Sequence, residues 1–268
     1  MTRDLHDGFR EPRSADSGQL SAFLREADRL PGVQQLHRVM RRALAVAPGT
    51  RILDAGCGIG LEAKRLAVAH PGSHVTGLDR NAELLRIARS AAPQPPNITW
   101  LEMDLTELKL ASASFDVIRT ERVLMYLPGT AFERVLDEFV RLLHPGGRLV
   151  LFELDYGATI LPPGHAGDEA VRRANAALDA SLPQPRAGRR IPRLLSDRGM
   201  ADVTATPMSF AVSEPIWRRI VHDTLLTRDG ERLDGTVATW LEEHAAVAAA
   251  GGFVAAFTGI LTTARHPG

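Results

Sequence analysis

The chain has 268 residues, of which 44% are hydrophobic and 24% are charged, a composition typical of a globular protein. Its 32 Lys and Arg residues balance its 32 Asp and Glu residues, so it lacks the basic excess with which nucleic-acid-binding proteins meet phosphates. The single cysteine, Cys57, excludes an intramolecular disulfide and a cysteine-based metal cluster.

Apolar runs of membrane-spanning length are absent from the sequence, and the polar residues 1–17 contain no apolar signal-peptide core. We therefore expect a cytoplasmic protein with no nucleic-acid or membrane partner. A homodimer is the assembly that the sequence leaves open.

Two amphipathic helices are predicted after this polar arm. Apolar residues recur at helical spacing over 20–30 and over 33–44, and Pro-Gly pairs at 31–32 and 48–49 end the two segments.

Strands then alternate with helices. The predicted strands cover 51–55, 74–78, 98–102, 115–120 and 148–154, and the predicted helices cover 61–70, 82–92 and 131–143. This alternation indicates a doubly wound α/β fold, with a mainly parallel sheet and helices on both faces.

The alternation stops after Asp155. Residues 156–168 read as a loop that contains Pro162-Pro163-Gly164. Further helices are predicted over 171–182, 191–198, 216–225 and 237–250, and further strands over 203–212 and 253–262. Because the sequence shows neither an internal repeat nor a low-complexity linker, we expect one domain over 1–268.

A glycine-rich turn, Leu53-Asp54-Ala55-Gly56-Cys57-Gly58-Ile59-Gly60, joins the first strand to a helix. Glycines permit a tight turn and a close approach of a ligand to the backbone, at the strand end where open α/β sheets bind ligands. The spacing is G-x-G-x-G and Leu61 follows, so the dinucleotide fingerprint G-x-G-x-x-G is not met. A tight turn without a ligand is the alternative interpretation.

Two carboxylates follow the next two strands. Asp79, which lies 19 residues after Gly60, is placed to accept hydrogen bonds from both ribose hydroxyls of a nucleoside; the alternative is a helix N-cap. Asp104 could accept the adenine amino group with Leu105 against the ring, although an Asp after a strand is commonly part of a turn.

Residues 50–155 resemble the core of the class I S-adenosylmethionine (SAM)-dependent methyltransferases, close to the branch that contains the ubiquinone/menaquinone-biosynthesis C-methyltransferases. The matching segments are the glycine-rich turn, Thr76-Gly77-Leu78-Asp79, Met103-Asp104, Ser114-Phe115-Asp116-Val117-Ile118 and Leu142-Leu143-His144-Pro145-Gly146-Gly147.

The resemblance implies a seven-stranded sheet with an antiparallel last strand. It also implies methyl transfer from SAM to a small molecule, such as a secondary metabolite or a quinone-like compound. The alternatives are a SAM-binding protein with a role other than methyl transfer and, less compatible with the glycine spacing, an NAD-dependent oxidoreductase.

The resemblance also implies which residues bind SAM. They are Asp54, Gly56, Cys57, Gly58, Gly60, Asp79, Arg80, Asp104, Leu105 and Glu121, with Glu121 beside the methionine part. Ile59 stands where many family members have Thr or Ser, so we expect the SAM carboxylate to rely on backbone N–H groups or on Arg38 or Arg41.

Methyl transfer from a sulfonium is an in-line displacement, in which the enzyme mainly holds the acceptor against the methyl group. A general base is a further requirement of some acceptors. The candidates by position are Glu121, Tyr126, Asp155, Tyr156 and His165, each of which also has a purely structural interpretation. His37 reads as a core residue or as part of a lid, and the sequence has no paired-histidine metal motif.

The chain thus divides by expected role. Residues 1–48 would form an arm and lid helices, residues 49–155 the SAM-binding core, and residues 156–268 an acceptor-pocket insertion with the final strands. We expect residues 156–187 and the two N-terminal helices to close over the site.

Overall fold

The computed structural model describes residue 9 and residues 17–160, 167–226 and 235–268. These residues form one seven-stranded sheet with the order β3-β2-β1-β4-β5-β7-β6. The strands are β1 (Arg51–Ala55), β2 (His74–Asp79), β3 (Ile98–Glu102), β4 (Phe115–Glu121), β5 (Leu143–Leu154), β6 (Ala201–Ala211) and β7 (Ala256–Arg265). Strands β1 to β5 pair in parallel, and β7 runs antiparallel to both β5 and β6. The mainly parallel sheet with an antiparallel last strand is confirmed.

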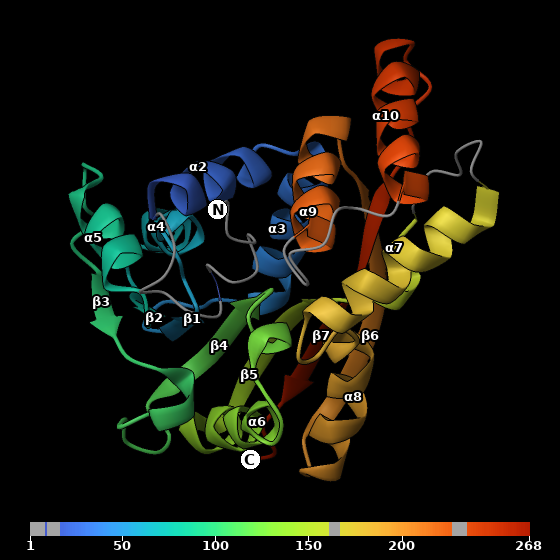
Figure 1. The fold of residues 1–268 in the computed structure, drawn as a ribbon. Coiled ribbons are helices and arrows are strands. Elements are labelled where there is room, and N and C mark those ends of the chain that lie inside the picture. Colours follow the sequence, from blue (N-terminus) through green and yellow to red (C-terminus); the bar gives the residue numbers. More distant parts are fainter. Residues whose placement is uncertain (1–8, 10–16, 161–166, 227–234) are drawn as a thin grey trace.

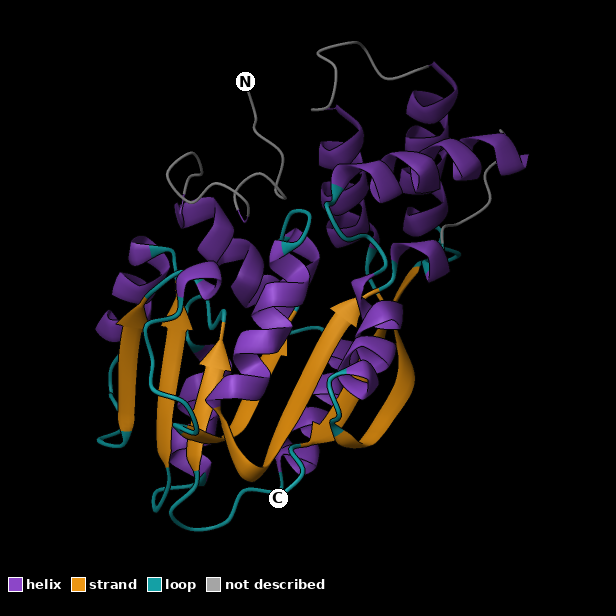
Figure 2. Cartoon of the chain, turned by 90° about the horizontal axis from the view of Figure 1, so that it is seen from below, coloured by secondary structure: helices purple, strands orange, loops and turns teal. Residues whose placement is uncertain are grey.

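Helices cover both faces of this sheet (Figure 1). One face carries α3 (Pro31–Leu44), α4 (Leu61–Ala69) and α5 (Ala82–Ser90), and the other carries α6 (Ala131–Leu142) and α8 (Ala187–Asp197). Figure 2 shows further helices gathered at the end of the sheet toward which the parallel strands point. They are α2 (Ser17–Asp28), α7 (Gly167–Ser181), α9 (Glu214–Leu226) and α10 (Gly235–Ala249). Across the described ranges, no helix combines the length and apolarity that crossing a membrane requires.

The buried stripe of α3 explains how an N-terminal helix is fixed to the core. Val33, Leu36, Met40 and Leu44 follow helical spacing and are at most 1% exposed. Burial of each such side chain contributes roughly 1.5–3 kcal/mol of transfer free energy. His37 lies on the same stripe and is 4% exposed, so this imidazole faces the core and not solvent.

The starts of β5 and β7 differ clearly from those predicted. β5 begins at Leu143, because Leu143 already pairs with Phe115 and the Pro-Gly-Gly segment forms an irregular stretch before regular pairing resumes at Arg148. β7 begins at Ala256 and not at 253, because α10 ends only at Ala249 and Gly251, with φ +78°, turns the chain back toward the sheet.

Candidate functional site

The glycine-rich turn is sterically required. Gly56, Gly58 and Gly60 have φ values of +75°, +54° and +72°, which side-chain-bearing residues rarely adopt. A Cβ on Gly56 would lie 2.4 Å from the Val123 side chain, and one on Gly60 would lie 2.3 Å from the Trp100 ring. A Cβ on Gly58 would instead meet only Leu24 Cδ1, at 3.3 Å, and Gly58 lines a cavity.

This cavity, of about 220 Å³, lies at the carboxyl ends of the parallel strands. Its wall combines polar groups with apolar side chains. The polar groups include the glycine turn and carboxylates at or near the ends of β1, β2, β3 and β4. The apolar side chains include Phe23, Leu24, Met125, Tyr126, Tyr156 and Ile220. The cavity therefore offers both polar and apolar surface to a ligand.

Asp79 joins β2 to the glycine turn. Its Oδ2 accepts a hydrogen bond from the Gly58 N–H at 2.8 Å, and its Oδ1 accepts one from the Asn81 N–H at 2.9 Å. Burial raises the pKa of Asp79, although these two N–H groups act in the opposite direction. Asn81 caps α5 by accepting from Glu83 and Leu84, so the N-cap alternative for Asp79 is wrong.

Asp104 takes part in a turn and also lines the cavity. Its Oδ1 accepts hydrogen bonds from the Thr106 N–H and hydroxyl, each at 2.8 Å, and its Oδ2 lies 3.6 Å from Arg80 Nη1. Burial opposes the charge of Asp104, but the bonds from Thr106 and the charge of Arg80 outweigh it and hold the pKa below its usual value. The turn interpretation and the binding interpretation are therefore compatible.

A buried ion pair in the cavity wall links β1 to β4. Arg119 Nη1 donates to Asp54 Oδ1 at 2.6 Å, and Nη2 donates to Glu121 Oε2 at 2.8 Å. Burial raises the pKa of Asp54 despite the charge of Arg119. Burial also opposes ionisation of Glu121, but Arg122, His37 and Arg119 together hold its pKa well below the usual range. Among the described residues, Asp54 Oδ2 is buried and has no hydrogen-bond partner.

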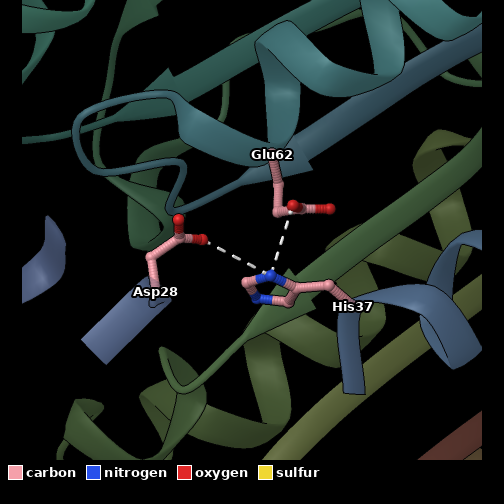
Figure 3. Close-up of side chains that lie close together, drawn as sticks. All are labelled: Asp28, His37 and Glu62. Atoms are coloured by element: carbon pink, nitrogen blue, oxygen red, sulfur yellow. Dashed lines mark ion pairs between the residues drawn. The ribbon is translucent and has the colours of Figure 1, made fainter. Parts of the chain in front are cut away.

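His37 faces the carboxylates of Asp28 and Glu62 (Figure 3) and lies beside a third carboxylate, that of Glu121. Its Nδ1 is 3.2 Å from Glu62 Oε1 and 3.5 Å from Asp28 Oδ1, and its Nε2 is 2.9 Å from Glu121 Oε2. Asp28, His37 and Glu62 could together offer three ligand atoms to a cation. Arg65 Nη1, however, donates to the same two carboxylate oxygens at 2.6 Å each, so a guanidinium already supplies the positive charge there.

Most residues named from the sequence line this cavity. They are Asp54, Gly56, Cys57, Gly58, Asp79, Arg80, Asp104, Leu105, Glu121 and Tyr126. Gly60 supports the turn from behind, against Trp100.

Other predicted residues lie elsewhere. Asp155 is outside the cavity lining and binds Arg189 and the Gly157 N–H, so its place in the structure favours the structural interpretation. His165 falls outside the described residues. Arg41 binds Glu62 and Arg38 binds Gln35, and neither lines the cavity, so the role expected for them toward the SAM carboxylate is not supported.

Sequence reasoning missed Arg119, Arg122, Glu62 and Asp28, all of which line the cavity. A signal for Arg119 was present. A charged residue inside the otherwise apolar strand over 117–120 must be paired if the strand is buried.

Comparison with known proteins agrees with this geometry. Residues 53–151 match the family model described as a methyltransferase domain. The matched range includes the glycine-rich turn, Asp79, Asp104 and Glu121.

Methyltransferases of several kinds are among the relatives. The chain is 32% identical over 126 residues to a demethylmenaquinone methyltransferase of Tropheryma whipplei, covering 47% of this chain and 51% of the relative. It is 32% identical over 170 residues to the 27-O-demethylrifamycin SV methyltransferase of Amycolatopsis mediterranei, covering 62% and 55%. The chain thus spans about half the length of the curated relatives it matches.

The fold has many solved counterparts. One is the [4+2]-cyclase SpnF, which superimposes with a TM-score of 0.56 over 88% of this chain and 81% of that one, at 20% identity. At that identity the likeness concerns the fold alone.

The cavity also holds charged groups suited to SAM. Its wall has six carboxylates and the guanidinium groups of Arg80, Arg119 and Arg122. Arg41 and Arg65 pair with two of the carboxylates, Asp28 and Glu62. SAM carries a sulfonium, an ammonium and a carboxylate, and carboxylates in the wall attract its two cationic groups. Among the described residues, the unpaired Asp54 Oδ2 offers a buried acceptor.

Proposed function

We propose that this protein transfers the methyl group of SAM to a small organic acceptor with an apolar body, such as a secondary metabolite or a quinone-like compound. The observation that supports this most strongly is a single cavity whose wall holds both carboxylates and apolar, aromatic side chains. The carboxylates suit the cofactor, and the apolar side chains suit an acceptor held next to it.

The residues that we propose to hold SAM are the polar groups of this wall. Asp79 would bind the ribose, Asp104 and Leu105 the adenine, and Glu121 the methionine part, while Gly58 leaves room at the turn. When bound, SAM supplies a methyl group that is activated by the positive sulfonium.

The acceptor would be held by residues outside the core motifs. Tyr126 lines the apolar wall and stacks on Phe9, with ring centroids 5.3 Å apart. Such a wall excludes water and fixes the orientation of the acceptor, which is the main requirement of an in-line displacement. Tyr126 and Glu121 are the cavity residues that we propose for proton transfer where the acceptor requires it, and a role for His165 remains a prediction.

The proposed lid is supported by contacts of α2 and α3 with the core. Leu20, Phe23 and Leu24 of α2 line the cavity. Asp28 at the end of α2 binds Arg65 of α4 at 2.6 Å, and His37 of α3 lies beside Glu121 at the end of β4. Tyr156 and Ile220 bring the part of the chain after residue 155 to the same wall. This arrangement supports a division into lid, cofactor core and acceptor-binding insertion.

A second candidate is a SAM-binding protein that catalyses another reaction. This second candidate is compatible with the fold, which the chain shares with a [4+2]-cyclase. In that case the apolar part of the cavity would bind a reactant that takes no methyl group.

One experiment separates the two. The purified protein is incubated with SAM and a panel of phenolic, quinone-like and polyketide-like compounds, and S-adenosylhomocysteine (SAH) and the products are measured by mass spectrometry. Methyl transfer predicts SAH together with a methylated compound, and loss of both in Gly58→Val. SAM binding without SAH formation for any compound, but with chemical change in one of them, would favour the second candidate. NAD binding in place of SAM binding would contradict both.

A further inference from the structure

Glu153, near the end of β5, is completely buried and lies behind the cavity wall. Its carboxylate accepts hydrogen bonds from three consecutive backbone N–H groups. Oε1 accepts from Val123 at 2.9 Å and from Leu124 at 2.8 Å, and Oε2 accepts from Met125 at 3.2 Å. Glu153 itself is not part of the cavity lining.

These three amides open the short 3₁₀ turn Leu124–Tyr126 that follows β4. The first N–H groups of a helical turn have no partner inside the turn and must be satisfied from outside. No side chain of the turn itself caps them. Glu153 therefore acts as the cap of this turn from a neighbouring strand.

The segment that Glu153 holds is a large part of the cavity wall. Arg122, Val123, Met125, Tyr126 and Leu127 all line the cavity. Arg122 has φ +56°, a conformation that side-chain-bearing residues rarely adopt and that surrounding structure must enforce. The three hydrogen bonds from the adjacent residues help to fix the chain in that conformation.

We propose that Glu153 is a positioning residue, which holds segment 122–127 and with it the Tyr126 ring in the wall that faces the acceptor. That this wall faces the acceptor rests on the proposed function. The hydrogen bonds by which Glu153 holds the segment do not depend on that function. Glu153 acts through the backbone of the segment and touches neither ligand.

The chemistry of the group agrees with such a role. An ionised carboxylate in a site without water is costly unless hydrogen bonds satisfy it. Burial raises the pKa of Glu153 to about 7, although the three N–H groups and Arg122 act in the opposite direction. A glutamine here would accept from Val123 and Leu124 through its single oxygen, but its NH₂ group would face the Met125 N–H, so the cap would be incomplete.

The two tyrosines of the chain allow a local test. Tyr126 and Tyr156 both line the cavity, so labelling with 3-fluorotyrosine gives one ¹⁹F resonance for each of two parts of the wall. The variants are Glu153→Gln and, as a matched control, Asp155→Asn, which changes another buried carboxylate of the same chain segment that binds Arg189 and not segment 122–127. Spectra, amide hydrogen exchange and SAH affinity are measured at about pH 8, where Glu153 is ionised.

We expect Glu153→Gln to shift or broaden the Tyr126 resonance and to speed exchange at the amides of residues 123–125 by about tenfold, the effect of losing roughly one net hydrogen bond. The Tyr156 resonance should stay in place and SAH affinity should change by less than about threefold, because Asp79 and the glycine turn are untouched. Asp155→Asn should leave the Tyr126 resonance unchanged.

A Tyr126 resonance and amide exchange identical to wild type in Glu153→Gln would overturn the proposal. Equal changes at both tyrosines would also overturn it, because they would indicate a general loss of stability. If Glu153→Gln does not fold, Glu153→Asp keeps the charge and shortens its reach, and a folded Glu153→Asp with an unchanged Tyr126 resonance would count against the proposal. Failure of the wild-type protein to bind SAH would instead refute the proposed function. The ¹⁹F and exchange data would still show whether Glu153 holds segment 122–127.

Discussion

The carboxylate of Asp79 and the backbone N–H of Gly58 are joined by a 2.8 Å hydrogen bond. This bond connects the end of β2 to the turn that follows β1, two segments that are separated by 21 residues. The residue proposed to bind ribose is therefore also a support of the glycine turn, and the cofactor-binding part of the cavity behaves as one unit.

We predict that Asp79→Ala weakens SAM binding by about 1–3 kcal/mol, because hydrogen-bonding partners are left unpaired. Isothermal titration calorimetry with SAM measures this directly. Asp116→Ala is the control, since Asp116 pairs with Arg51 outside the cavity. Unchanged SAM affinity in Asp79→Ala would remove Asp79 from the site.

We predict that Gly58→Val abolishes SAM binding more completely than it destabilises the fold. A side chain at Gly58 would project toward Leu24 at the cavity wall. Gly129→Val is a matched control, because Gly129 has a similar φ of +49° and a Cβ there would meet nothing within 4 Å. Both variants should lose roughly 1–2 kcal/mol of stability from the left-handed backbone. If both bind SAM equally well, Gly58 does not face the cofactor.

The two ion pairs that join β1 to β4 should differ in their contribution to stability. Arg119→Met leaves the buried Asp54 carboxylate unpaired and should lower the free energy of unfolding by about 3–5 kcal/mol. Arg51→Met breaks a pair whose side chains are 42% and 34% exposed and should cost less than about 1 kcal/mol. Urea denaturation of both variants gives these values. Equal losses would show that burial does not set the contribution of the Arg119 pair.

The ionisation of Glu153 should make stability depend on pH. Burial raises its pKa in the folded protein from the ordinary 4.5 to about 7. Between these values the folded chain binds a proton that the unfolded chain has released. The contribution of this proton to the free energy of unfolding is therefore fully present below about pH 4.5 and is lost as the pH rises through about 7.

The loss attributable to this group is on the order of 3 kcal/mol. It is measured as the difference in free energy of unfolding between wild type and Glu153→Gln at several pH values, since other titrating groups are common to both proteins. A difference that does not change with pH would show that Glu153 keeps an ordinary pKa.

The sequence predicted the fold well because the sheet follows from local signals. Apolar strands alternate with amphipathic helices, and glycines and prolines mark their ends. Only a few sheet topologies are compatible with this order of elements. The start of β7 was placed three residues too early, because the apolar run over 253–255 continues the strand pattern although Gly251 and Gly252 still turn the chain.

The cavity residues from the glycine turn, β2 and β3 could also be named from the sequence, since each directly follows a strand. Contacts between distant elements could not. Arg119 of β4 lies opposite Asp54 of β1. This pairing depends on the register of the two strands, which the sequence of either strand alone does not determine. His37 could be assigned to a buried stripe, but not to the carboxylates of α2, α4 and β4 that face it.

A crystal structure of the protein with SAH tests the central claim most directly. We predict SAH in the cavity, with both ribose hydroxyls within hydrogen-bond distance of the Asp79 carboxylate, adenine beside Asp104 and Leu105, and the sulfur directed toward the apolar wall that contains Tyr126. SAH bound elsewhere, or bound with its ribose away from Asp79, would contradict this account.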